Sequence, residues 1–125
     1  MLLLLDAHAL LWWLAADRTL SAAAARSIAD PMNDVVVSAA TVWEIEVKRA
    51  AGRLEARLEL VEDLARAQID TLPFTAADAV AAARLPRHHK DPFDRMLLAQ
   101  AQRLEAVIVS RDRAFAAYGV HVLLA

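Results

Sequence analysis

The alternation of short apolar runs with longer alanine-rich segments is the feature that most constrains this chain. Four runs rich in leucine and β-branched residues predict strands at 2–5, 35–37, 107–109 and 120–124, and a weaker run at 69–72 predicts a fifth. None of them alternates apolar with polar residues, which is typical of strands buried on both faces of a parallel sheet. Strands that alternate with helices predict an α/β fold with a mainly parallel sheet.

The segments between the strands show helical periodicity and recognisable helix ends. Ser21 is a predicted N-cap, and Gly52 is a predicted stop for the helix that Ser38 can start. Thr75 and Asp78 have the spacing of a capping box, and Asp91 followed by Pro92 is a typical helix start. The helix after Ser21 is predicted to end at residue 28, and the next two cover 39–51 and 58–68. The helix after Thr75 ends before Pro86. The last two are predicted at 92 to about 104 and at 113–117.

Chain length and composition limit the fold and the chemistry. The 125 residues suit a single domain spanning 1–125. The absence of cysteine excludes a thiol nucleophile, a disulfide scaffold and a cysteine-built zinc site. Two glycines, Gly52 and Gly119, leave no glycine-rich phosphate loop. Asp6 interrupts the apolar start and no basic residue precedes it, so we expect no signal peptide, no membrane span and a cytoplasmic protein.

Acidic residues stand where the predicted strands lead into helices. Asp6 follows the first strand, and Asp112 follows the strand at 107–109. Glu44 lies in the helix that leaves the second strand, and Asp94 lies in the first turn of the helix before 107–109. Open α/β sheets bind ligands at the carboxyl ends of their strands. We therefore expect these acids, which come from distant parts of the sequence, to converge at one edge of the sheet.

Each acid also has a purely structural explanation. Asp6 and Asp112 could cap helices, Asp94 could stabilise a helix dipole, and Glu44 stands four residues before Lys48 as an ordinary helix pair. Considered together, clustered carboxylates repel one another unless a cation neutralises them. Mg²⁺ prefers oxygen ligands and can activate water against a phosphodiester. The set therefore predicts metal-assisted phosphodiester hydrolysis that needs no histidine base.

The charge distribution gives evidence both for and against a nucleic-acid partner. The formal net charge of −2 argues against one. Polar and basic residues nevertheless flank the acids, and we expect them to hold substrate phosphates: Arg95, Arg111, Ser110, His89 and Lys90. The neighbouring Trp12 and Trp13 cannot share one helix face, which favours an exposed apolar patch for a partner.

Four segments resemble one known family in the right order over essentially the whole chain. The first reads LLDAHALLWWL at 4–14, the second SAATVWEI at 38–45, and the third, long and specific, LPRHHKDPFDRMLLAQA at 85–101. The fourth reads SRD at 110–112, followed by Phe115 and by YGV at 118–120. These segments resemble PIN-domain proteins, specifically VapC-type toxins of bacterial toxin–antitoxin modules.

The resemblance implies a PIN-like three-layer sandwich, an endoribonuclease acting on RNA, toxin dimers or larger assemblies, and a VapB-like antitoxin. It makes Asp6, Glu44, Asp94 and Asp112 the acidic quartet, with Asp6 and Asp94 as the principal ligands of Mg²⁺ or Mn²⁺ and Asp112 close by. This chain departs from the family at Ala7, where a hydroxyl residue is common. Asp91 is interpreted as the cap of its helix.

Three other classes of protein share parts of this sequence pattern with a nuclease. A phosphoryl-accepting receiver domain needs an acid pair after the first strand and a late lysine, whereas Asp6 stands alone and the lysines are Lys48 and Lys90. A non-catalytic binding module that keeps the fold stays an alternative, although all the expected acids are present. A metal-dependent phosphatase is a further alternative, because flanking arginines do not distinguish it from a nuclease.

Overall fold

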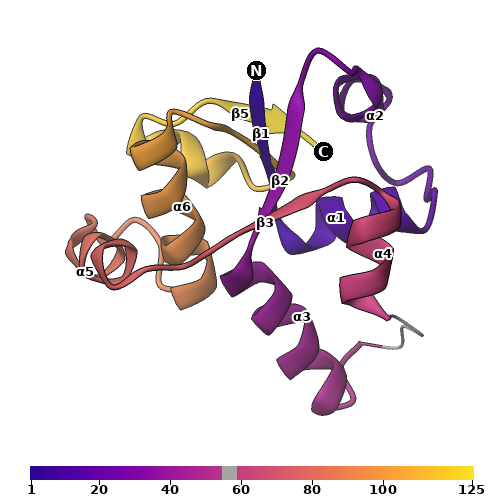
Figure 1. Ribbon diagram of the computed structural model, residues 1–125. Coiled ribbons are helices and arrows are strands. Elements are labelled where there is room, and N and C mark those ends of the chain that lie inside the picture. Colours follow the sequence, from indigo (N-terminus) through magenta and orange to yellow (C-terminus); the bar gives the residue numbers. More distant parts are fainter. Residues whose placement is uncertain (55–58) are drawn as a thin grey trace.

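The computed structural model describes residues 1–54 and 59–125, and it has a five-stranded parallel sheet at its centre (Figure 1). The strand order is β3-β2-β1-β4-β5, and every pairing is parallel. The strands are β1 (Leu2–Leu5), β2 (Asp34–Ser38), β3 (Asp70–Leu72), β4 (Val107–Ser110) and β5 (Val122–Leu124). The predicted α/β class with about five parallel strands is confirmed.

The predicted helices are present in the predicted order, and a further helix, α1, follows β1. The helices are α1 (Ala7–Leu14), α2 (Ala22–Ala29), α3 (Ala39–Ala50), α4 (Leu60–Arg66), α5 (Ala76–Arg84), α6 (Pro92–Leu104) and the 3₁₀ helix η1 (Arg113–Tyr118). Ser21, Ser38 and Asp91 cap α2, α3 and α6 as predicted, and Thr75 with Asp78 forms a complete capping box on α5. These ends are short-range features, which is why local patterns located them.

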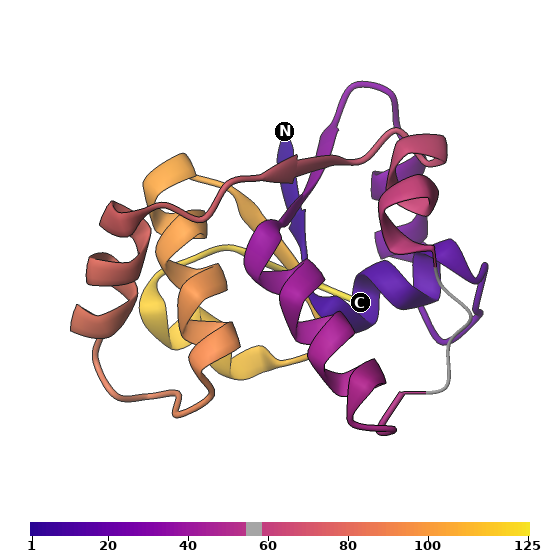
Figure 2. The same ribbon diagram turned by 60° about the horizontal axis from the view of Figure 1, so that its bottom comes forward.

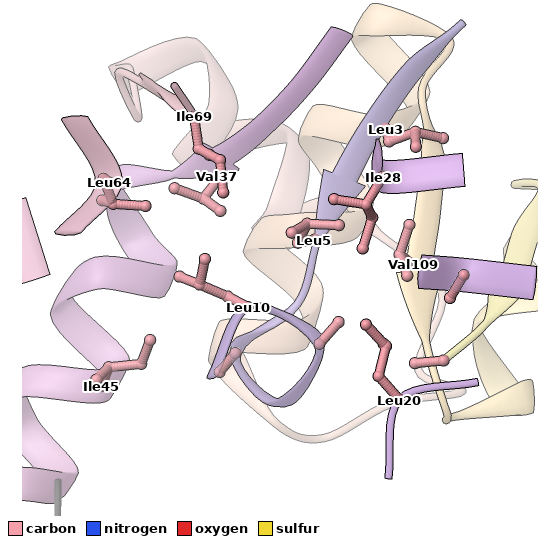
Figure 3. Packing of buried hydrophobic residues seen from close by; sticks show 14 of the residues in the cluster. Leu3, Leu5, Leu10, Leu20, Ile28, Val37, Ile45, Leu64, Ile69 and Val109 are labelled. Carbon is pink, nitrogen blue, oxygen red and sulfur yellow. The ribbon is translucent and has the colours of Figure 1, made fainter. Parts of the chain in front are cut away.

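Two apolar clusters fix the helices on opposite faces of the sheet. Leu3 and Leu5 of β1 point into one cluster, together with side chains of α1, α2 and α4 (Figure 3). Leu4 points to the other face, where α6 and η1 cover the sheet. Helix α5 packs outside α6, and α3 extends from the sheet edge between α1 and α6 (Figure 2). Side chains alternate along a strand, so a single apolar run supplies both cores.

Some predicted boundaries differ from the structure. Strand β5 begins at Val122 rather than at 120, and the predicted helix at 113–117 is a 3₁₀ helix. The predicted start of α4 at residue 58 lies outside the described residues, and α4 itself begins at Leu60. No helix in the described part of the chain is long and apolar enough to span a membrane.

Candidate active site

Asp6 stands where the central strand ends. Its backbone N–H donates to the carbonyl oxygen of Val109 at 3.1 Å, so the backbone is still held by β4 as the chain turns into α1. Its Oδ1 accepts from the N–H of Ala9 at 2.8 Å and caps α1. The side chain of Ser110 also hydrogen-bonds to this carboxylate. Asp6 is therefore a helix cap and, as described below, a wall of a cavity as well.

Asp112 is supported by the same serine from the neighbouring strand. Ser110 ends β4, is fully buried, and its Oγ accepts from the N–H of Asp112 at 3.0 Å. Asp112 Oδ1 caps η1 by accepting from the N–H of Ala114 at 2.9 Å. Because β1 and β4 are adjacent and parallel, Ser110 links the carboxylate and the backbone of the two acids that follow them.

Asp94 enters the site from the first turn of α6. Asp91 Oδ1 accepts from the N–H groups of Phe93 at 2.8 Å and Asp94 at 3.1 Å, which fixes the start of the helix. The carboxylate of Asp94 is directed to the carboxyl edge of the sheet, where its side chain is 29% exposed. The cap predicted at Asp91 thus positions a second acid one turn further along.

Glu44 completes the set from α3. Its Oε2 lies 2.6 Å from Lys48 Nζ, so the ordinary helix pair predicted from the spacing does form. The carboxylate is nevertheless largely buried, with 12% of the side chain exposed, and faces the other acids. Trp43, next to it, is largely exposed and contacts Phe93 edge-on at 5.2 Å, and Ile45 is buried in the core.

These side chains line one cavity of about 360 Å³ at the carboxyl edge of the sheet. It lies where the chain passes from β1 to β2 on one side and returns at β4 on the other, the usual place for a ligand in such a sheet. The polar lining groups are Asp6, Thr41, Glu44, Lys48, Asp91, Asp94, Ser110, Arg111, Asp112 and His8.

The electrostatics of the cavity favour a cation. Burial, together with the neighbouring charges of Asp91 and Glu44, raises the pKa of Asp94 to about 7. Burial likewise raises the pKa of Asp6 above its ordinary value, in spite of hydrogen bonds from Ser110 and Ala9. A bound cation would favour the ionised forms of these two carboxylates. The donor set is made of hard oxygens, so these residues fit a divalent ion such as Mg²⁺.

His89 lies against this acidic group. Its Nε2 is 3.2 Å from Asp112 Oδ2, and its Nδ1 is 3.9 Å from Asp94 Oδ2. The ring is 14% exposed and packs on Phe115 and Tyr118, with centroids 5.0 and 6.2 Å away. Of the two residues of this loop expected to hold substrate phosphates, His89 is turned inward, whereas Lys90 is exposed.

The chain matches the family model of the PIN domain over residues 3–120. The chain belongs to the PIN domain family. No curated protein matches this PIN domain.

Three solved structures share the fold of this PIN domain over nearly their whole length. VapBC2 from Rickettsia felis, bound to a promoter DNA fragment, has a chain with 10% identity and a TM-score of 0.69, covering 98% of each chain. FitAcB from Neisseria gonorrhoeae gives 18% identity and a TM-score of 0.67, covering 98% of this chain and 96% of that one. A toxin–antitoxin complex from Klebsiella pneumoniae has a chain with 20% identity and a TM-score of 0.65, and the match covers 97% of this chain and 95% of that one.

Two arginines predicted to hold substrate have other partners in this PIN domain. Arg95 turns away from the cavity and donates to backbone carbonyls of the α5–α6 connection, among them Leu85 at 2.7 Å, Pro86 at 3.0 Å and His89 at 3.1 Å. Arg111 Nε donates to the carbonyl of Ala125 at 3.0 Å, and its guanidinium lies 4.5 Å from the centre of the Trp12 ring. Both arginines therefore hold segments of the chain together, while Arg111 also lines the cavity, and the substrate contact of both stays a prediction.

Sequence reasoning missed some residues of the cavity. Thr41 is buried and lies one turn before Glu44 on α3, and Lys48 lies one turn after it. Their spacing places all three on one face of the helix, which was the signal available in the sequence. Asp91, interpreted as a cap with a share in the acidic centre left open, also lines the cavity and adds to the charge acting on Asp94.

A second depression of about 1380 Å³ lies on the other side of α1. Its walls are largely apolar side chains of α1, including Leu11, Trp12, Trp13 and Leu14, with parts of α2 and α4 opposite. Both tryptophans are half-buried and line this groove. The apolar surface predicted around the tryptophan pair is thus a concave groove.

Proposed function

We propose that this chain is a Mg²⁺-dependent endoribonuclease and the toxin of a VapBC-type toxin–antitoxin module. The observation that carries the proposal is the convergence of Asp6, Glu44, Asp94 and Asp112, from four separate segments, in one cavity at the carboxyl edge of the sheet. Membership of the PIN family and the fold shared with toxin–antitoxin complexes support it. We expect it to act in the cytoplasm.

The proposed chemistry divides the work among the acids. Asp6, Asp94 and Asp112 would hold the ion, which when bound would polarise the scissile phosphodiester and activate water. Glu44, paired with Lys48 on the cavity wall, would orient that water. The Ser110 side chain hydrogen-bonds to the carboxylate of Asp6 and to the backbone N–H of Asp112, so it would contribute to substrate binding by holding these two acids in place. Lys90, exposed beside the cavity mouth, would contact RNA phosphates.

The test is cleavage of total bacterial RNA by the purified chain. With Mg²⁺ we expect discrete fragments, and with EDTA we expect none until Mg²⁺ is restored, because the acids cannot act on a phosphodiester without a cation. A matched assay on a phosphate monoester should give no turnover. Cleavage that persists in EDTA would overturn the metal-dependent mechanism. Turnover of the monoester with intact RNA would favour a phosphatase, and no turnover of either by folded protein would favour a binding module.

We propose that the antitoxin binds in the groove along α1. Apolar side chains on both walls suit the apolar face of a partner helix. We expect Trp13→Glu to weaken binding of a co-expressed VapB-like antitoxin by roughly 30-fold, the effect of losing a buried aromatic anchor. Val80→Glu on α5 is the control, since Val80 is equally apolar, 49% exposed and far from the groove. Calorimetry on both folded variants checks this, and unchanged affinity in Trp13→Glu would move the antitoxin to another surface.

We further propose that the chain forms homodimers. Trp43 and Val47 are 57% and 37% exposed on one side of α3, away from both apolar cores. A partner chain would bury this apolar surface. Light scattering should give twice the mass of one chain, and Trp43→Glu should give the mass of a single chain.

A further inference from the structure

One ring nitrogen of His89 has no hydrogen-bond partner although it is buried. The Nε2 atom lies 3.2 Å from Asp112 Oδ2, but the contact lacks hydrogen-bond geometry. Buried polar atoms are nearly always satisfied, and an exception calls for a missing partner. The atom faces the acidic group directly, since suitable atoms of His89, Asp94 and Asp112 all lie within 4.8 Å of one another.

The position of this ring is fixed by the surrounding structure. The backbone N–H of His89 donates to the hydroxyl oxygen of Tyr118 at 2.6 Å, and that hydroxyl donates to the carbonyl of Pro86 at 2.9 Å. Arg95 holds the carbonyl of His89 from the other side. The ring itself is stacked on Tyr118 and tilted against Phe115. A side chain held at this many points is preorganised beside Asp94 and Asp112.

The neighbouring histidine provides an internal contrast. His88 is exposed, contacts Tyr118 edge-on at 5.1 Å, and takes no part in the acidic group. The same loop therefore directs one imidazole outward and the other toward Asp94 and Asp112.

We propose that Nε2 of His89 is a nitrogen ligand of the divalent ion, beside Asp94 and Asp112, and that it raises the affinity of the centre for Mn²⁺ relative to that for Mg²⁺. The inference rests on the metal centre proposed above and adds a residue to it. Mg²⁺ binds oxygen ligands almost exclusively, whereas imidazole suits first-row transition ions. An imidazole ligand added to the carboxylates would therefore shift the metal preference toward Mn²⁺.

The experiment measures metal binding without RNA. Free Mn²⁺ is followed by electron paramagnetic resonance, Mg²⁺ affinity is obtained by competition, and pulsed measurements detect nitrogen coupled to bound Mn²⁺. The unaltered chain should show this coupling, and His89→Gln should lose it. The Mn²⁺ affinity of His89→Gln should fall by about tenfold or more, with a much smaller change for Mg²⁺. His88→Gln, which alters the exposed histidine of the same loop, should keep both the coupling and the affinity.

The outcomes separate this inference from the proposed function. Mn²⁺ bound without nitrogen coupling, or Mn²⁺ and Mg²⁺ affinities that fall equally in His89→Gln, would overturn the ligand role. Coupling that disappears in His88→Gln would assign the nitrogen elsewhere, and this variant and the unaltered chain decide the matter even if His89→Gln does not fold. Asp94→Asn should weaken both ions. Normal binding by Asp94→Asn, or no binding by the unaltered chain, would instead refute the acidic centre itself.

Discussion

Asp94→Asn is expected to lower RNA cleavage by at least about 1,000-fold while making the metal-free protein more stable. A loss of this size is typical when a group that stabilises charge in the transition state is removed. The gain in stability arises because the carboxylate of Asp94 is desolvated and stands near Asp91 and Glu44, which disfavours its ionised form in the folded state. Asparagine keeps the shape and removes the charge.

The stability that the metal-free protein gains from Asp94→Asn should increase with pH. The pKa of Asp94 is raised to about 7 in the folded protein, so between pH 4 and 7 the folded state holds a proton that the unfolded state has lost. The stability of the metal-free chain therefore falls as pH rises through this window, and the fall levels off above it. Thermal unfolding in EDTA should show Asp94→Asn gaining more over the unaltered chain at pH 8 than at pH 5.

Asp34→Asn is the matched control for this prediction. It makes the same change of charge at the exposed first residue of β2, at the opposite edge of the sheet from the cavity. We expect normal cleavage and no pH-dependent gain in stability from it. An Asp94→Asn variant that still cleaves RNA, or one whose gain shrinks as pH rises, would contradict the role assigned to this carboxylate.

Asp78→Ala should lower the free energy of unfolding by about 2–4 kcal/mol, because it removes a helix cap and the charge-assisted hydrogen bonds to Arg103, whose side chain is 49% exposed. Asp78 is 1% exposed, and its Oδ1 accepts from Arg103 Nε at 2.7 Å. Its Oδ2 accepts from the N–H of Thr75 at 3.1 Å, which completes the capping box of α5. The substitution removes both the cap and the link to α6, so urea unfolding monitored by circular dichroism should show the full loss.

Glu46→Ala provides the comparison for an exposed pair. Glu46 contacts Arg49 at 3.0 Å with both side chains about two-fifths exposed. Such pairs contribute at most about 1 kcal/mol. Equal losses in Asp78→Ala and Glu46→Ala would show that burial does not strengthen the Asp78 pair.

The pH dependence of the Asp78 pair has the opposite sign to that of Asp94. Burial opposes ionisation, but hydrogen bonds from Arg103 and Thr75 outweigh it and hold the pKa of Asp78 below its ordinary value. The stabilisation is therefore complete above the ordinary pKa and is lost as pH falls through the lowered one. The deficit of Asp78→Ala should accordingly shrink in acid.

The sequence by itself determined the elements and their order. Apolar runs without alternation predicted the parallel strands, and β1 to β5 formed within two residues of the predicted bounds. Ser21, Ser38, Thr75 and Asp91 were correctly predicted as helix caps. These features depend on residues within a turn of one another, so a local pattern contains the information needed. The positions of Asp6 and Asp112 after parallel strands also indicated that they would meet, because parallel strands end at the same edge.

Only the tertiary structure decided which partners the polar side chains take. Asp78 was predicted as a cap, yet Arg103, 25 residues away, makes it part of a buried ion pair. Arg95 was predicted to bind phosphate, yet it joins the α5–α6 connection, and His89 in that connection is turned inward. A long flexible side chain can reach several groups, and the one it binds depends on how α5, α6 and η1 pack. That packing is set by apolar contacts between segments far apart in the sequence, and a local pattern of charged residues does not predict such contacts.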